Sequence, residues 1–368
     1  MLKTLQTTGQ VLRGARALGT SPVTISSGRG GRSSTNSHTV TVFGATGRMG
    51  RYLVNSLGQQ GTQIILPHRC DVHTVQYLKL SSDLGQQHPV YTPDFNDEAH
   101  LEEVVKYSDV VVNLTGSHKP RLHHSFMDSN ATLTHKIARA CKNVGTPCFI
   151  HMSHINADPD SKSQYLRAKA LSEEIVLHEL PDSAIIIRSA DCFHGWDEFS
   201  HYLARINTRK RLIQKGRTFI YKRGEVTYKQ PVFGPDVMKA ITRIITTPDQ
   251  DRHRLYQFIG PKVYSLNEFM QSITDMTYRM YKPIFNPIRH FVEADIWRHE
   301  NYIRYQMISD TPTHGLPGLE DVGIRPAAFE DEAVAWLRNY RIFWQVWDPI
   351  DGQRSNIYNN SVGTGENF

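Results

Sequence analysis

The hydrophobic pattern of the chain alternates between short β-branched runs and longer amphipathic segments. Runs such as 110–112 are continuously apolar, as expected of strands that a parallel sheet buries on both faces. Segments 100–107, 131–143 and 165–178 have helical spacing and lie between such runs. The expected strands are 40–43, 64–66, 90–91, 110–114, 148–152 and 185–188. This order predicts an α/β fold with a doubly wound, Rossmann-type parallel sheet and ligands at the carboxyl ends of its strands.

The regular alternation ends near Gly195. Pro235-Asp236-Val237 has the composition of a cap that opens a helix running to 245. From 248 onward, aromatic residues and prolines predict shorter helices and loops that close over the carboxyl edge of the sheet. We therefore predict a dinucleotide-binding domain at 38–196, a smaller C-terminal, substrate-type lobe at 197–350 that returns to the first domain near 231–245, and a polar tail at 351–368.

The first 37 residues have the composition of a mitochondrial presequence. They are rich in Ser, Thr and Gly, carry five basic residues, and precede the first acidic residue of the chain, Asp71. Residues 2–18 can form a basic, weakly apolar helix without the compact apolar centre of a secretory signal, although a disordered arm is the alternative. The net charge of +6 falls to +1 when those five basic residues leave with the presequence, so nucleic acid is not an expected partner.

No apolar run approaches the roughly 20 residues that cross a bilayer, so any membrane association is expected to be peripheral or through a partner. The four cysteines lack the spacing of metal ligands, and Cys141 and Cys148 suit buried positions in a helix and a strand. The histidines at 118, 123, 124, 151 and 154 also show no convincing ligand spacing. We therefore expect no metal site.

Three glycines spaced three apart follow the first strand and open a helix. Glycine lets a backbone approach a phosphate closely, and the helix that follows presents N–H groups and a positive dipole end to the anion. The spacing differs from the standard dinucleotide fingerprint, so an ordinary turn with glycines chosen for sterics is the alternative. The residues expected to contact a cofactor here are Gly44, Thr46, Gly47, Arg48, Met49 and Gly50; a solvated helix face is an equal alternative for Arg48 and Arg51.

Arg69 follows the second strand, where an NAD site usually has an acidic residue for the ribose. A guanidinium suits a 2′-phosphate, which favours NADP(H) over NAD(H), although Asp71 lies two residues further on. Asp94 follows the third strand and can meet the adenine or cap the next helix. Asn113, Thr115 and Gly116 end the fourth strand, where the ribose or nicotinamide would pass.

Tyr165 and Lys169 stand four residues apart on one expected helix, and Ser153 ends the fifth strand. On a shared helix face, the Lys169 ammonium can lower the pKa of the Tyr165 phenol, and Ser153 can polarise a carbonyl. These three residues are the candidates for both catalysis and nicotinamide contact. A surface pair on an amphipathic helix is the alternative for Tyr165 and Lys169.

With these motifs in place, the chain resembles the extended and atypical short-chain dehydrogenase/reductases and, within them, the reductase-like accessory subunits of mitochondrial complex I, the NADH:ubiquinone oxidoreductase. The segments that carry the resemblance are 41–47, 67–71, 83–86, 149–157, 165–167, 229–232 and 316–324. The last of these is specific to the accessory subunits and is not shared by reductases at large.

The resemblance implies an accessory subunit on the matrix side of the inner membrane, at the junction of the matrix and membrane arms, with other complex I subunits as partners. It implies a bound NADP(H) that supports folding and assembly without turnover, and Gly44, Gly47, Gly50 and Arg69 carry over as cofactor contacts. Contact with inner-membrane lipid stays open, because segment 281–290 is relatively polar.

Tyr165 and Lys169 carry over as matching positions only. Ser153 lies nearer to Tyr165 in sequence than in typical extended reductases, so we expect vestigial residues and no catalysis. The alternative function is an active NADPH-dependent reductase or epimerase that uses Tyr165 and Lys169 on a small carbonyl or a sugar-nucleotide. An RNA-associated protein of reductase fold is disfavoured by the near-neutral mature charge.

Overall fold

The computed structural model describes residues 36, 38–83, 85–118, 125–197, 200–201, 204, 218–219, 225–247, 252–277, 283–284 and 305–340, with the backbone alone at 218–219 and 283–284. The expected presequence, except Asn36, and the tail at 351–368 lie outside the described residues. The basic run 205–217 and most of segment 281–290 also lie outside them, as do His123 and His124.

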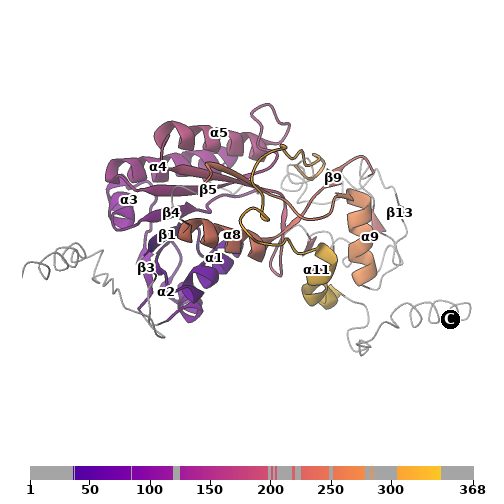
Figure 1. Ribbon diagram of the computed structural model, residues 1–368, viewed down its shortest axis with the longest axis horizontal. Coiled ribbons are helices and arrows are strands. Elements are labelled where there is room, and N and C mark those ends of the chain that lie inside the picture. Colours follow the sequence, from indigo (N-terminus) through magenta and orange to yellow (C-terminus); the bar gives the residue numbers. More distant parts are fainter. Residues whose placement is uncertain are drawn as a thin grey trace, which may run out of the picture.

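Seven parallel strands form the central sheet (Figure 1). Their order is β11-β6-β5-β4-β1-β2-β3. They are β1 (Thr39–Phe43), β2 (Gln63–His68), β3 (Gln87–Tyr91), β4 (Val110–Asn113), β5 (Cys148–His154), β6 (Ala184–Ser189) and β11 (Leu255–Phe258). The doubly wound fold expected from the sequence is confirmed. The strand order reverses between β1 and β4, where sheets of this kind open a crevice for ligands.

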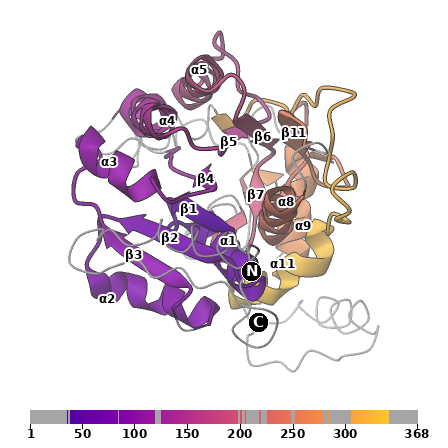
Figure 2. The ribbon, with the colours of Figure 1, turned by 60° about the vertical axis from the view of Figure 1, so that its left-hand side comes forward.

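Helices cover both faces of the sheet (Figure 2). One face packs against α1 (Arg48–Gln59) and α8 (Gly234–Thr246), and α2 (Val72–Val75) and η2 (Gln76–Ser81) lie beside α1. The other face packs against α3 (Glu98–Val105), α4 (Leu133–Val144) and α5 (Gln164–Glu179). A π-helical turn, η3 (Asp128–Thr132), leads into α4.

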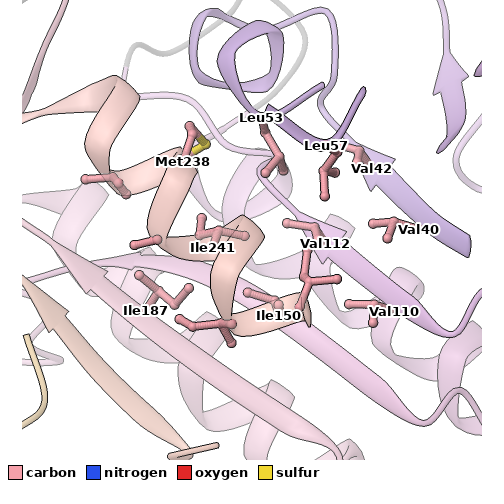
Figure 3. Packing of buried hydrophobic residues seen from close by; sticks show 14 of the residues in the cluster. Val40, Val42, Leu53, Leu57, Val110, Val112, Ile150, Ile187, Met238 and Ile241 are labelled. Carbon is pink, nitrogen blue, oxygen red and sulfur yellow. The ribbon is translucent and has the colours of Figure 1, made fainter. Parts of the chain in front are cut away.

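The alternation of side chains along each strand decides which layer they join. Val40 and Val42 of β1 face α1 and α8, whereas Phe43 joins the core under α3 and α4. Figure 3 shows the first layer, where six strand residues meet side chains of α1 and α8: Val40, Val42, Val110, Val112, Ile150 and Ile187 against Leu53, Leu57, Met238 and Ile241. Each such side chain, when fully buried, stabilises the fold by about 1.5–3 kcal/mol.

The expectation that the chain after 248 forms only short helices and loops is wrong at β11. This strand pairs with β6 and buries Tyr256 and Phe258. Its polar residue, Gln257, is also buried. Its burial is compensated because its backbone N–H donates to the carbonyl of Pro317 and its side-chain oxygen accepts from the N–H of Thr313. A four-residue strand with a buried glutamine carries too weak a pattern to be recognised from its own sequence.

A smaller layer lies beyond the carboxyl edge of the sheet. It contains α9 (Leu266–Met276), α11 (Phe329–Leu337) and η6 (Arg338–Tyr340), and its core includes Phe193, Phe269 and Phe329. Three short strand pairs join it, namely β7 (Cys192–Phe193) with β10 (Val232–Phe233), β9 (Tyr228–Lys229) with β12 (Tyr264–Ser265), and β8 (Thr218–Phe219) with β13 (Pro283–Ile284). Within the described part of the chain, we find no helix with the length and apolarity to cross a membrane.

Candidate nucleotide site

The glycine turn lies at the strand-order reversal, between the ends of β1 and β4. Gly44 has φ +85°, and a Cβ on it would approach the backbone carbonyl of Leu114 to 3.1 Å. A Cβ on Gly50 would lie 2.3 Å from the carbonyl oxygen of Gly44, so only glycine lets α1 pack this close to β1. Close packing alone therefore explains why Gly44 and Gly50 are glycines, as in the alternative of an ordinary turn.

The start of α1 is what suits the turn to an anion. Gly47 is the N-cap, no side chain caps the helix, and the first turn contains no acidic residue. The positive end of the helix dipole is thus not neutralised by a carboxylate of its own first turn. Thr46 is half-buried in the turn, and Met49 packs against the hydrophobic core.

The two arginines of the first helical turn have specific surroundings. Arg48 is exposed and acts electrostatically on two buried groups, His194 and Asp197. Burial raises the pKa of Asp197 to about 7, against the opposing effects of its bonds to Ser200 and of the Arg48 charge. The Arg51 guanidinium lies over the ring of Tyr77, 4.6 Å from its centroid. Arg51 is therefore engaged by an aromatic ring, which a purely solvated face would not provide.

The end of β4 forms a turn that its own side chain holds. The side-chain oxygen of Asn113 accepts from the backbone N–H of Thr115 at 3.0 Å and from its hydroxyl at 2.6 Å. Gly116 has φ +154°, and a Cβ there would meet the Asn130 side chain at 2.6 Å and Lys169 Nζ at 3.3 Å. The structure thus brings the end of β4 next to Lys169.

After β2, Arg69 is exposed and its guanidinium lies 5.2 Å from the centroid of the Phe95 ring. Asp94 accepts from the backbone N–H of Asn96 at 2.8 Å and so forms a local turn. The helix cap is Asp97, which accepts from the N–H of His100. The residue that caps α3 is therefore Asp97 and not Asp94.

Ser153 and Lys169 lie on adjoining elements, β5 and α5. The Lys169 ammonium is buried and donates to the backbone carbonyl of Met152 at 2.8 Å. Burial lowers the pKa of Lys169 to about 8, partly offset by Glu173. Ser153 Oγ is buried and has no hydrogen-bond partner among the described residues.

The expectation that Lys169 lowers the pKa of Tyr165 is wrong. The pKa of the Tyr165 phenol is raised, first by burial and then by Asp191 and Cys192. The ammonium that would oppose this rise is bonded to Met152 instead. The ring of Tyr165 packs edge-on against three others, with centroid separations of 6.2 Å to His118, 6.2 Å to His154 and 5.3 Å to Tyr305.

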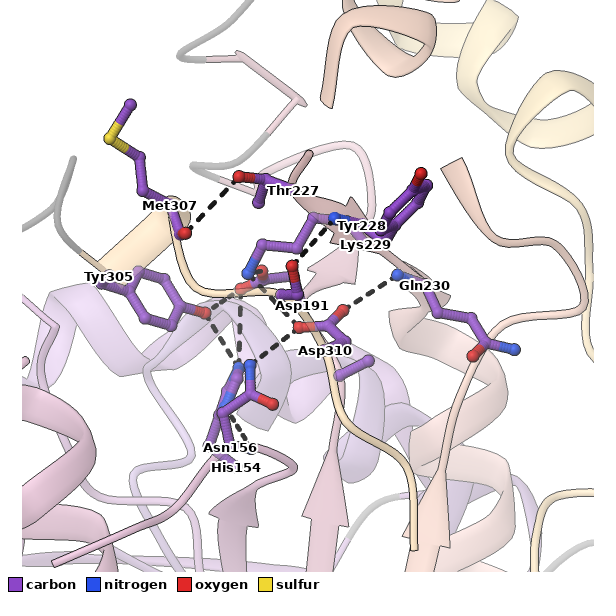
Figure 4. A network of polar contacts seen from close by, with 12 residues as sticks. His154, Asn156, Asp191, Thr227, Tyr228, Lys229, Gln230, Tyr305, Met307 and Asp310 are labelled. Atoms are coloured by element: carbon purple, nitrogen blue, oxygen red, sulfur yellow. Dashed lines mark hydrogen bonds and ion pairs between the residues drawn. The ribbon is translucent and has the colours of Figure 1, made fainter. Parts of the chain in front are cut away.

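A buried polar network that the sequence analysis did not identify adjoins Tyr165 (Figure 4). The ammonium of Lys229, with no exposed surface, lies 3.1 Å from a carboxylate oxygen of Asp191 and 3.3 Å from one of Asp310. The Tyr305 hydroxyl donates to Asp191 and lies 3.0 Å from His154 Nε2. Asp191, two residues after β6, and His154, the last residue of β5, stood at positions that their strands could have marked.

Two titrating groups of this network stabilise each other's charged forms. Burial alone would raise the pKa of Asp191, but the charges of Lys229 and His154 outweigh it and lower that pKa. Burial alone would likewise lower the pKa of Lys229, but the two carboxylates raise it. Among the described residues, no group of three or more His, Cys, Asp or Glu side chains is arranged to hold a metal ion, and none of the four cysteines forms a disulfide.

Residues 36–176 match the NmrA-like family. The chain is 37% identical to the mitochondrial NADH dehydrogenase [ubiquinone] 1 alpha subcomplex subunit 9 of Rattus norvegicus over 336 residues. This match covers 88% of this chain and 86% of the rat protein. The chain belongs to the alpha subcomplex subunit 9 family. The 40 kDa subunit of NADH-ubiquinone oxidoreductase from Neurospora crassa is 30% identical, over 85% of this chain and 82% of that protein. The resemblance noted from the sequence is therefore confirmed.

Two solved structures similar to this member of the subunit 9 family are enzymes named for their sugar-nucleotide substrates. The dTDP-glucose 4,6-dehydratase DesIV of Streptomyces venezuelae, with NAD and TYD bound, has a TM-score of 0.60 and 15% identity, over 85% of this chain and 100% of that one. The UDP-glucose 4-epimerase of Thermotoga maritima has a TM-score of 0.59 and 14% identity, over 82% and 99%. At such identity, the likeness confirms the fold and carries no activity over to this chain.

Proposed function

We propose that the chain is an accessory subunit of mitochondrial respiratory complex I that holds NADP(H) as a structural ligand and performs no catalysis with it. Membership of the subunit 9 family across most of the chain carries this proposal. The described geometry supports its second half, because a nucleotide cradle lies beside a Tyr-Lys pair that is not arranged for proton transfer.

The residues present fit a dinucleotide. Gly44, Gly47 and the uncapped start of α1 would hold the pyrophosphate, and the exposed Arg69 would meet a 2′-phosphate. The buried, unpartnered Ser153 Oγ is an orphan that a ligand can satisfy. Bound nicotinamide would supply hydride-transfer chemistry. The further proposed contacts are Thr46, Arg48, Met49, Gly50, Asp94, Asn113, Thr115, Gly116, Tyr165 and Lys169, with the last two at the nicotinamide end.

The proton chemistry of the chain argues against turnover. A reductase of this kind needs a phenol whose proton moves readily near neutral pH. Here burial, Asp191 and Cys192 raise the pKa of Tyr165, and Lys169 donates to a backbone carbonyl of β5. The pair therefore orients and stabilises α5 against β5 without preparing a proton donor.

A ligand that only the folded state binds stabilises that state. At roughly 100- to 1,000-fold excess over Kd, the gain is on the order of 3 to 4 kcal/mol. This linkage gives the nucleotide a role in assembly that requires no turnover. We further propose a cleaved presequence, a peripheral position on the matrix side at the junction of the two arms, contact with other complex I subunits, and no nucleic-acid partner.

Nucleotide analysis tests the proposal directly. The protein is purified under native conditions, the bound nucleotide is released by denaturation and identified, and mitochondria are resolved by blue-native electrophoresis. We expect NADP(H) in the purified protein and co-migration of the chain with complex I. Recovery of the chain only as a free monomer would overturn the assignment to complex I, and absence of any nucleotide would overturn the structural-ligand role.

The competing function is an active reductase or epimerase, favoured by the meeting of Ser153, Tyr165 and Lys169 at one edge of the sheet. It predicts that Tyr165→Phe abolishes a measurable hydride transfer and leaves assembly intact. Our proposal predicts that this variant keeps both its nucleotide and its assembly, and that wild-type protein transfers no hydride to small carbonyls or sugar-nucleotides.

A further inference from the structure

Residues 305–313 cross the carboxyl edge of the sheet and are bonded to elements far away in the sequence. Tyr305 contacts Asp191 after β6 and His154 at the end of β5. The amide of Asn156 donates to Asp310 at 2.9 Å and accepts from the backbone N–H of Thr311 at 3.1 Å. The segment is therefore anchored over the ends of β5 and β6, the edge that also carries Ser153.

Charge fixes the segment in this position. Asp310 accepts from the Lys229 ammonium and from the backbone N–H of Gln230, at 3.3 and 2.9 Å. Its own backbone N–H donates to the carbonyl of Tyr228 at 2.9 Å. Lifting the segment would leave Lys229 and Asp191 buried with part of their compensation removed, which proteins tolerate poorly.

Tyr305 packs directly against Tyr165, one of the residues of the proposed nicotinamide end. Its ring is 5.3 Å from that of Tyr165 at an interplanar angle of 81°, and it also packs with Leu166 in a small buried cluster. Only 6% of Tyr305 is exposed, and its hydroxyl is held by Asp191 and His154. A rotamer that swung the ring away would break both of those bonds.

We propose that Tyr305 occupies the substrate side of the Tyr165 site, so that the chain itself excludes small carbonyl substrates from a bound nucleotide. This inference rests on the proposed function, which puts the nicotinamide end at Tyr165 and Lys169. Tyr305 acts here as an exclusion residue, and the ion pairs of Lys229 with Asp191 and Asp310 hold its segment in place.

The test uses the full chain loaded with NADPH and compares Tyr305→Ala with Tyr305→Phe. Collisional quenching of the nicotinamide fluorescence by acrylamide measures access to the site. Removal of the ring is expected to raise the quenching constant several-fold, whereas Tyr305→Phe keeps the ring and stays near wild type. Added 4-methylphenol should refill the space in Tyr305→Ala and restore protection, as small apolar molecules fill engineered cavities.

The two proposals fail in different ways. If no form of the protein binds nucleotide, the structural-ligand role is wrong. The exclusion role is then tested by the effect of 4-methylphenol on the melting temperature. This compound should raise the melting temperature of Tyr305→Ala and leave that of wild type unchanged. If NADPH is bound and its acrylamide quenching constant in Tyr305→Ala equals that in wild type, the exclusion role is wrong. Should the alanine variant not fold, Tyr305→Leu replaces it in the test, because leucine keeps packing against Leu166. An unchanged quenching constant in Tyr305→Leu would equally contradict the exclusion role.

Discussion

The ammonium of Lys169 donates to the backbone carbonyl of Met152 at 2.8 Å and so ties the first turns of α5 to β5. This bond diverts the ammonium from the Tyr165 phenol. The buried Lys169 charge is then stabilised by this one acceptor and by the negative charge of Glu173. Such a lysine costs stability at neutral pH, because the unfolded chain binds its proton more tightly.

Lys169→Met is expected to change the pH dependence of stability. In wild type, burial lowers the pKa of Lys169 from its ordinary 10.5 to about 8, so the unfolded state binds more protons between these values and stability rises with pH there. The full difference corresponds to about 3 kcal/mol. Lys169→Met loses this rise, which urea unfolding of the nucleotide-free protein at pH 7 and pH 10 measures. Lys162→Met, at an exposed position, is the control and should unfold with the wild-type pH dependence.

Lys229→Met is expected to destabilise the protein by about 3–5 kcal/mol, because it leaves the carboxylates of Asp191 and Asp310 buried without their cation. Lys262→Met removes a lysine from an exposed pair with Glu330 and should cost less than about 1 kcal/mol. Thermal and urea unfolding compare the two. A double variant, Lys229→Met with Asp310→Asn, should recover part of the loss. Equal stability of the two lysine variants would show that the buried pairs do not hold the segment.

The strands and helices of the sheet, apart from β11, were predictable because their pattern is local. Val110 to Val112, for example, reads as a strand buried on both faces, and it is one. The glycine turn follows from the same local elements. The polar network does not, because Tyr305 reaches Asp191 across 114 positions and Asn156 reaches Asp310 across 154. Nothing near Tyr305 in the sequence indicates that its partner lies after β6.

Gly50→Ala is expected to be strongly destabilising, by about 3 kcal/mol or more, because its Cβ would collide with the backbone of Gly44 and Ala45. Neither neighbour is a flexible side chain that can move aside. Gly145→Ala is the matched control: Gly145 has φ +76° with open space around it, so the variant carries only the cost of a left-handed backbone, roughly 1–2 kcal/mol. Urea unfolding ranks the two. A Gly50→Ala protein as stable as Gly145→Ala would mean that α1 can move away from β1.

Arg69→Glu tests the choice between NADP(H) and NAD(H). A charge-assisted contact between a guanidinium and a 2′-phosphate is worth about 1.5–3 kcal/mol, so its loss should weaken NADPH binding by about 10- to 100-fold. Binding of NADH, which lacks that phosphate, should change little or improve, because the glutamate can accept from the ribose hydroxyls. Isothermal titration of the nucleotide-free protein gives both affinities. Arg69 is exposed and its ring contact is with Phe95, so the substitution should leave folding almost unchanged. Arg325→Glu, at an exposed position outside the proposed contacts, controls for the same change of charge. A variant that retained the wild-type preference for NADPH would move the phosphate contact to another residue, with Arg48 and Arg51 of the first turn of α1 as the next to substitute.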